Sequence, residues 1–163
     1  MTNLTRQQIL DQYRGIRRIV INTKHGGFGL SPEGCMYYLK LCGQESWIED
    51  GESTLFRRLS GPKIWLVPPD ADRVNYDVEP EEWAKMSMAE RQAHSALCEQ
   101  QIFSDRDLPR DDPFLCKVVD DLGAEANGKF ADLKVVDIPA DVEWEIQEYD
   151  GNEWVAEKHR TWS

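Results

Sequence analysis

A histidine, two glycines and a phenylalanine follow an apolar run near the start of the chain. The run is Ile-Val-Ile at 19–21, and His25, Gly26, Gly27 and Phe28 come shortly after it. Glycine allows the backbone to approach a bound group closely or to take a positive φ angle. An apolar strand followed by such a loop is typical of a ligand-binding turn. We therefore expect His25 to Phe28 to contact a ligand.

Ser31, Pro32 and Glu33 predict that a helix begins directly after this loop. Serine is a favoured N-cap, proline fits the first helical position, and glutamate suits the first turn. The unpaired amides at a helix start attract anions, so this order of elements predicts an anionic ligand. Two observations favour the alternative of a structural turn. The glycine spacing matches neither the Walker A nor the dinucleotide-binding motif, and Glu33 repels an anion.

A second group of charged residues lies before another predicted helix start. It contains Arg106 and Arg110 together with Asp107, Asp111 and Asp112. Two guanidinium groups can hold a phosphate or carboxylate through paired hydrogen bonds. The alternative is local ion pairing, with Asp112 as the cap of the helix that Pro113 begins. Because Asp112 is better used as a cap, we expect no metal site on the three aspartates.

A third group lies near the end of the chain and combines Trp144, Glu157, Lys158, His159, Arg160 and Trp162. Glutamate and histidine two residues apart share one face of a strand, so beside an indole they can act in acid–base chemistry. The alternative is that the two side chains satisfy each other. A hydrolase that uses Glu157 and His159 is therefore one hypothesis for this chain, although we favour a protein without enzymatic activity.

We expect the three groups to converge at one rim of the fold. There the glycines give backbone access, the arginines neutralise phosphate, and Phe28 or Trp144 stacks on a base. The expected ligand is a nucleotide-like anionic small molecule, bound without a cofactor or a metal. The expected ligand-binding residues are His25, Gly26, Gly27, Phe28, Arg106, Arg110, Trp144, His159 and Arg160.

These groups depend on an expected α+β fold in a single domain over residues 1–163. A mixed or antiparallel sheet of about four strands is covered by three helices, and residues 43–80 form an irregular insertion. Residues 4–14 can add a short helix capped by Thr5 and Gln8. The expected strands are 17–23, 133–138, 142–149 and 153–160, with an extended segment at 63–67. The expected covering helices are 31–42, 88–103 and 112–126.

The Asp150-Gly151 pair predicts a two-residue hairpin turn of type I′. In that register the numbers of opposed residues sum to 301, so Glu157 lies opposite Trp144 on the apolar face of the hairpin. A three-residue loop would put the other face inward, so the exposure of Glu157 and His159 depends on the turn.

The composition excludes several function classes. The formal net charge is −11, and residues 104–163 hold 16 acidic against 7 basic side chains, so we expect no binding to duplex nucleic acid. No run of about 20 apolar residues suits a membrane, and no signal-peptide pattern opens the chain. The four cysteines lack zinc-ligand spacing. Nucleophilic catalysis is disfavoured because Gly-x-Ser-x-Gly is absent and no cysteine neighbours a histidine. The pattern favours a reduced, cytoplasmic protein.

Several segments resemble a widespread set of small bacteriophage proteins without an assigned activity. The similar segments are residues 22–31, 106–113, 138–151 and 157–162. The resemblance implies an accessory role in the host cytoplasm, for example the sequestration of a host defence signal, and it assigns no catalytic residues. An alternative partner is a host protein, bound by an acidic surface that mimics nucleic acid. A homo-oligomer is also left open.

Overall fold

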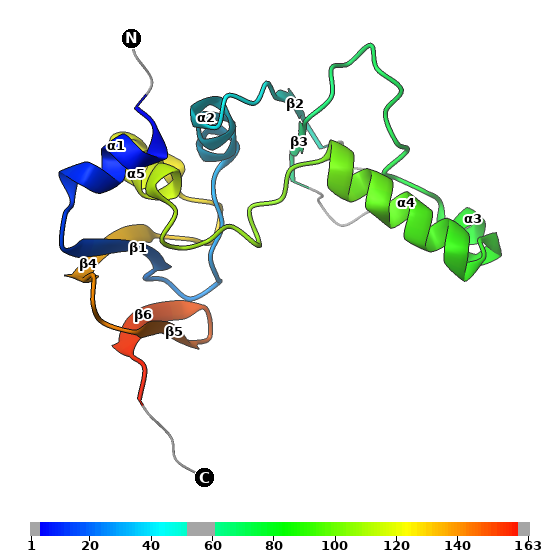
Figure 1. Ribbon diagram of the computed structural model, residues 1–163. Coiled ribbons are helices and arrows are strands. Elements are labelled where there is room, and N and C mark those ends of the chain that lie inside the picture. The colour runs from blue at the N-terminus through cyan, green and yellow to red at the C-terminus, as the bar shows by residue number, and fades with distance from the viewer. Residues whose placement is uncertain (1–3, 52–60, 160–163) are drawn as a thin grey trace. The chain divides into compact units, whose positions relative to one another are not determined.

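The computed structural model describes residues 4–51 and 61–159 (Figure 1). Contacts divide the chain into two compact units, one from residues 1–42 and 105–163 and the other from residues 43–104. The insertion predicted at 43–80 begins at the same residue as the second unit. The division into domains stays a prediction.

The described residues confirm the α+β class but correct the predicted sheet. Instead of one sheet of about four strands, six strands pair as three separate two-stranded sheets. Five α-helices are present where three were expected to cover a sheet. The first unit contains α1 (Arg6–Gln12), β1 (Ile16–Asn22), α2 (Pro32–Leu41), α5 (Pro113–Leu122), the 3₁₀ helix η1 (Gly123–Ala126), β4 (Leu133–Pro139), β5 (Trp144–Tyr149) and β6 (Asn152–Glu157).

The helices of the first unit begin where the sequence predicts. Thr5 and Gln8 form a capping box at α1, and Ser31 Oγ accepts the Gly34 amide at the start of α2. Asp112 caps α5 by accepting the Phe114 amide at 2.9 Å. These caps satisfy amides that have no partner inside a helix. Local polar residues therefore determine where each helix starts.

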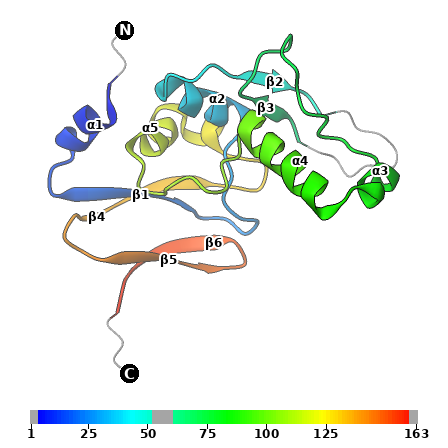
Figure 2. The ribbon, with the colours of Figure 1, turned by 45° about the vertical axis from the view of Figure 1, so that its right-hand side comes forward.

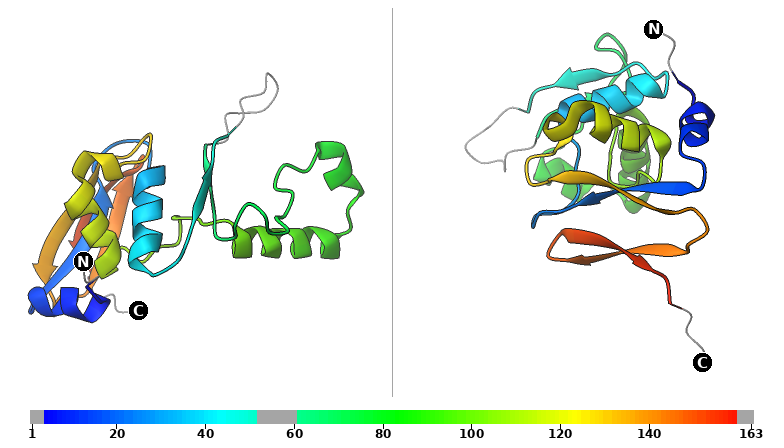
Figure 3. Two further views of the ribbon diagram at one scale, coloured as in Figure 1. Left: turned by 90° about the horizontal axis from the view of Figure 1, so that it is seen from above. Right: turned by 90° about the vertical axis from the view of Figure 1, so that its left-hand side faces the viewer.

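The antiparallel pair of β1 and β4 lies at the centre of the first unit. Helices α2 and α5 lie on one side of this pair and the β5–β6 hairpin lies on the other (Figures 2 and 3, right). Covered on both faces, β1 buries Ile19, Val20, Ile21 and Asn22 in succession. This arrangement explains the continuous apolar run of β1, because a strand buried on both faces does not alternate.

Side chains and a loop, rather than a third strand, close the second edge of β1. Val20 N donates to Arg110 O at 2.8 Å, and Asn22 N donates to Glu153 Oε2 at 2.8 Å. Strand β6 therefore approaches β1 through the Glu153 carboxylate and not through a backbone ladder. The predicted four-strand sheet is wrong for this reason.

The β5–β6 hairpin has the predicted turn and register. Asp150 and Gly151 have φ angles of 50° and 82°, as a type I′ turn requires. Trp144 pairs with Glu157 and Tyr149 with Asn152. The predicted register is confirmed, and Glu153 shares the inward face with Val155.

The second unit contains β2 (Trp47–Glu49), β3 (Lys63–Trp65), α3 (Pro80–Lys85) and α4 (Met88–Gln101). Ser87 and Glu90 form the predicted capping box of α4, and none of its described residues is fully buried. The end of α4 joins β3, because Phe103 N donates to Ile64 O at 2.8 Å and Leu66 N donates to Gln101 O at 2.7 Å. Ile64 and Trp65 form the buried centre of this unit.

Candidate functional site

The glycines of the predicted ligand loop are used in close packing between three loops. A Cβ atom at Gly26 would lie 2.8 Å from the Cβ of Phe130, and one at Gly151 would overlap the backbone nitrogen of Gly27. Gly26 N also donates to Asp150 O at 3.3 Å. The missing side chains thus allow backbones to meet, which matches the structural alternative for this loop.

Asn22 holds the same three loops together and is fully buried. Its Nδ2 donates to Lys24 O and Gly151 O at 2.6 Å each, and its Oδ1 accepts the Asp132 amide at 2.8 Å. A buried amide with its hydrogen bonds made is stable and specifies one arrangement of its neighbours. Sequence reasoning missed this role, because nothing local marks Asn22.

Arg110 is paired inside the protein. Its Nη1 and Nη2 donate to the two carboxylate oxygens of Glu153 at 2.9 Å each, and its Nη1 also donates to Val20 O at 3.3 Å. Its guanidinium carbon lies 3.6 Å from the centre of the Phe28 ring. Arg110 and Phe28, both predicted ligand residues, therefore contact each other, and Arg110 is paired with Glu153. Sequence reasoning missed Glu153.

The predicted convergence at one rim is wrong, because two of its residues lie at opposite ends of the hairpin. His25 Nδ1 lies 3.3 Å from Asp150 O, at the turn. His159 follows the far end of β6, where Lys158 N donates to Glu143 O at 2.9 Å. A strand of this length separates the two ends by roughly 20 Å.

The other predicted site residues lie at exposed or half-buried positions. Arg106, Glu157 and His159 are exposed, whereas Trp144 is half-buried. Arg160 lies outside the described residues. Both members of the predicted acid–base pair, Glu157 and His159, are therefore open to solvent and do not lie in a buried site.

Asp112 is the centre of a buried polar cluster. Arg6 Nε donates to its Oδ1 at 3.0 Å and Arg6 Nη2 to its Oδ2 at 3.1 Å, and the Tyr38 hydroxyl donates to Oδ2 at 2.6 Å. Burial alone would raise the pKa of Asp112, but the hydrogen bonds from Arg6, Tyr38 and the Phe114 amide outweigh it and hold that pKa below its usual range. Burial and the bond to Asp112 raise the pKa of Tyr38. The cluster fastens α1 to α2 and α5.

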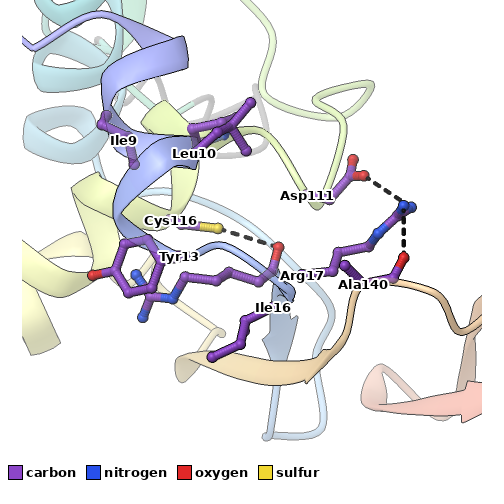
Figure 4. A pocket seen from close by; sticks show the side chains of 10 residues that line it. Ile9, Leu10, Tyr13, Ile16, Arg17, Asp111, Cys116 and Ala140 are labelled. Carbon is purple, nitrogen blue, oxygen red and sulfur yellow. Dashed lines mark hydrogen bonds and ion pairs between the residues drawn. The ribbon is translucent and has the colours of Figure 1, made fainter.

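A pocket of about 210 Å³ lies between α1, β1 and α5 (Figure 4). Most of its wall is apolar, and its charged lining residues are Arg17, Arg18 and Asp111. Figure 4 shows the Arg17 side chain directed toward Asp111 and the carbonyl of Ala140. The lining residues are Ile9, Leu10, Tyr13, Ile16, Arg17, Arg18, Asp111, Pro113, Cys116 and Ala140.

The two arginines of this pocket are held very differently. Arg18 donates to Asp120 at 2.6 Å and to Asp137 at 3.0 Å, and it stacks on the Tyr13 ring at 4.3 Å. Arg17 lies 3.7 Å from Asp111 and 3.4 Å from Ala140 O. Hydrogen bonds of good geometry are about 2.7–3.2 Å long, so the Arg17 guanidinium is loosely held. Its side chain is 40% exposed, against 15% for Arg18.

Sequence reasoning did not single out this pocket. Its signal was the segment 9–18, which holds four apolar or aromatic residues and three arginines on the two sides of Gly15. Gly15 has a φ angle of 77° and turns the chain from α1 into β1, which brings Leu10 and Ile16 to the same opening. Both side chains are exposed in spite of their apolar character.

One cysteine lies beside a histidine, which corrects the prediction that no such neighbour exists. Cys98 Sγ lies 3.7 Å from His94 Nδ1 on α4. The signal was present in the sequence, because residues four apart share a helix face. Cys35 and Cys116 are more deeply buried than Cys98, and burial raises the pKa of each of these two thiols to about 12.

Residues 4–51 and 61–159 contain neither a candidate metal site nor a candidate membrane-spanning helix. No group of three or more histidine, cysteine or acidic side chains has the arrangement of a metal site. Across the same ranges, no helix has the length and apolar character needed to cross a bilayer. Comparison of the chain with protein families, curated proteins and solved structures found no match.

Proposed function

We propose that this chain is a non-enzymatic binding protein and that its pocket between α1, β1 and α5 takes a compact amphipathic anion. The apolar body of such a ligand occupies the space beside Ile9 and Ile16, and its carboxylate or phosphate meets Arg17. The observation that carries the proposal is a loosely held guanidinium among the lining residues of a mostly apolar pocket.

Arg17 is the anion-binding group of this proposal because its present contacts are weak. A ligand anion within 3 Å gives a stronger interaction than Asp111 at 3.7 Å, since charge-assisted hydrogen bonds shorten to about 2.8 Å. Arg18 keeps its own carboxylate partners. Asp120 and Asp137 neutralise its charge, so its part in the pocket is to hold the Tyr13 ring.

The volume of the pocket limits the ligand. Pockets for drug-sized ligands usually measure about 300–1,000 Å³, and this one measures about 210 Å³. A single base or aromatic ring with one anionic group suits that volume, whereas a dinucleotide exceeds it. The nucleotide-like ligand expected from the sequence is therefore proposed here as a nucleoside monophosphate, at a different site from the glycine loop.

The test is a binding screen with nucleoside 5′-monophosphates and aromatic carboxylic acids, by thermal shift and then calorimetry. A hydrogen bond to a charged group contributes about 1.5–3 kcal/mol, so Arg17→Gln should weaken binding roughly 10- to 100-fold. Arg14→Gln is the matched control, because Arg14 is exposed nearby and does not line the pocket. Equal losses in both variants, or no binding at millimolar concentrations, would refute the proposal.

The resemblance to small bacteriophage proteins supplies a setting for this binding. We propose an accessory role, in which the protein withdraws a small anionic signal of the host. Release of the monophosphate unchanged after incubation, checked by chromatography, is the expected result for a protein without enzymatic activity.

A second candidate function is the binding of a basic protein partner by the outward face of the β5–β6 hairpin. Tyr149 is 73% exposed and Trp154 is 44% exposed on that face. Glu143 and Glu145 belong to the same face, and the Asp150 side chain at the turn is 81% exposed. Exposed aromatic rings beside carboxylates favour lysine and arginine side chains.

The two candidates differ in their salt dependence and in the residues that they need. Tyr149→Ala with Trp154→Ala should abolish capture of a lysine- and arginine-rich peptide and leave monophosphate binding unchanged. Peptide binding should also weaken as salt rises from 50 to 500 mM, because exposed charges are screened. Peptide capture that survives the double substitution excludes this face.

A further inference from the structure

A cysteine that lines a second pocket lies beside a histidine on α4. His94 and Cys98 are four residues apart, and Cys98 Sγ lies 3.7 Å from His94 Nδ1. This distance is within the range of a sulfur hydrogen bond. The pair belongs to the second unit and is independent of the pocket in Figure 4.

The other contacts of His94 determine which ring nitrogen accepts the thiol proton. His94 Nε2 lies 2.8 Å from Asn75 O, and a carbonyl oxygen can only accept a hydrogen bond. Nε2 therefore carries the proton of the neutral ring, which leaves Nδ1 as an acceptor facing Cys98. Trp83 meets the ring edge-on with the ring centres 5.5 Å apart. The carbonyl and the indole hold the imidazole in this orientation.

The thiol borders a space that is large enough for a small molecule. The pocket measures about 470 Å³, and Cys98 shares its wall with Ile64, Tyr76 and Ile102. Lys63 and Glu99 are its charged lining residues. Lys63 is already engaged, because its Nζ lies 3.3 Å from Asp77 Oδ2 and 4.9 Å from the centre of the Tyr76 ring. The wall thus favours an uncharged aromatic or aliphatic group.

We propose that Cys98, with His94 as its proton acceptor, is a site of thiol–disulfide exchange for small uncharged disulfides that enter this pocket. The thiol proton moves to His94 Nδ1 while the Cys98 sulfur attacks one sulfur of the disulfide. A new S–S bond forms, the old S–S bond breaks, and the leaving thiolate takes the proton from His94. Cys98 is oxidised to a mixed disulfide, and the departing half of the disulfide is reduced to a thiol.

Burial and Glu99 raise the pKa of the Cys98 thiol, so the thiolate is scarce at neutral pH. Exchange consequently depends on proton transfer to His94 in the same step. A thiol that reacts only through its free thiolate has no such dependence. The role of the histidine is therefore the part of the proposal that is easiest to test.

The experiment uses the full chain with Cys42→Ser, because Cys42 is the other accessible cysteine among the described residues. The probe is 4,4′-dithiodipyridine, a neutral aromatic disulfide that releases a thione with strong near-ultraviolet absorption. We expect one equivalent of thione, a mass increase located at Cys98, and a rate that saturates with probe concentration. Cys35 and Cys116 should react only after unfolding.

Two comparisons complete the test. Adding His94→Gln should slow the exchange about 10-fold or more, whereas a substitution that merely opens the pocket would speed it. The dianionic reagent 5,5′-dithiobis(2-nitrobenzoate) should react more slowly than the neutral probe and without saturation. A rate that is linear in probe concentration, or that is unchanged by His94→Gln, overturns the proposal. Far-ultraviolet circular dichroism checks that α4 stays folded in each variant.

Discussion

Glu153→Gln should destabilise the protein strongly, because Glu153 neutralises Arg110 at the second edge of β1. The side chains are only 10% and 19% exposed, and two hydrogen bonds of 2.9 Å join them. Glutamine keeps the shape and can still accept the Asn22 amide, so the change isolates the lost charge. Removing one partner of a buried pair costs about 3–5 kcal/mol.

At the lower end of that range, the loss corresponds to a melting temperature reduced by roughly 6–12 °C for a chain of this size. Urea unfolding followed by tryptophan fluorescence measures the free energy directly. The control is Glu157→Gln, four residues along the same strand, where the side chain is exposed and the expected change is below about 0.5 kcal/mol.

A double variant tests the stated cause. If the loss arises from an unpaired Arg110 charge, then Arg110→Met combined with Glu153→Gln should recover much of the stability. A loss below about 1 kcal/mol in Glu153→Gln would refute the reasoning. The reasoning would also be refuted if the double variant lost more unfolding free energy than the two single variants lose together.

Two further predictions concern the Asp112 cluster and the hairpin turn. The pKa of Asp112 is lower in the folded state than in the unfolded chain. The stabilisation from Asp112 is therefore complete above the unfolded pKa near 4 and is lost as the pH falls through the folded pKa. The difference in unfolding free energy between the wild type and Asp112→Asn, measured with urea, should shrink below pH 4. The raised pKa of Tyr38 has the opposite sign, so its contribution should be lost as the pH rises above about 10, and Tyr38→Phe should flatten that alkaline decline. Gly151→Ala should lower the melting temperature far more than Gly15→Ala, because both glycines have positive φ but only the Cβ at Gly151 meets another backbone; equal losses would show that φ strain alone matters.

Local features of this fold could be predicted from the sequence. Thr5, Ser31, Ser87 and Asp112 mark helix starts because each cap acts on an amide within three residues. Asp150 and Gly151 determine the hairpin register for the same reason: a type I′ turn admits few residues and sets the opposition of every pair that follows.

The candidate site was less predictable because its chemistry depends on distant partners. In the sequence, Arg110 resembles an anion-binding residue. In the fold, its Nη1 and Nη2 donate to Glu153, which lies 43 positions later. Asn22 has its partners at residues 24, 132 and 151. Arg17 becomes the available cation only because Arg18 already has Asp120 and Asp137. Nothing in the sequence distinguishes the loosely held Arg17 from the ion-paired Arg18 beside it.

The closure of β1 has a consequence for how the chain is made. Residues 16–22 pair with residues 133–139, and the partners of the second edge of β1 are Arg110 and Glu153. During synthesis, the apolar strand therefore emerges more than a hundred residues before its partner strand. Long-range pairings of this kind form slowly, and an unpaired apolar strand is prone to aggregate. The yield of folded protein should thus depend on whether residues 19–21 are covered by other groups before β4 and β6 have been synthesised.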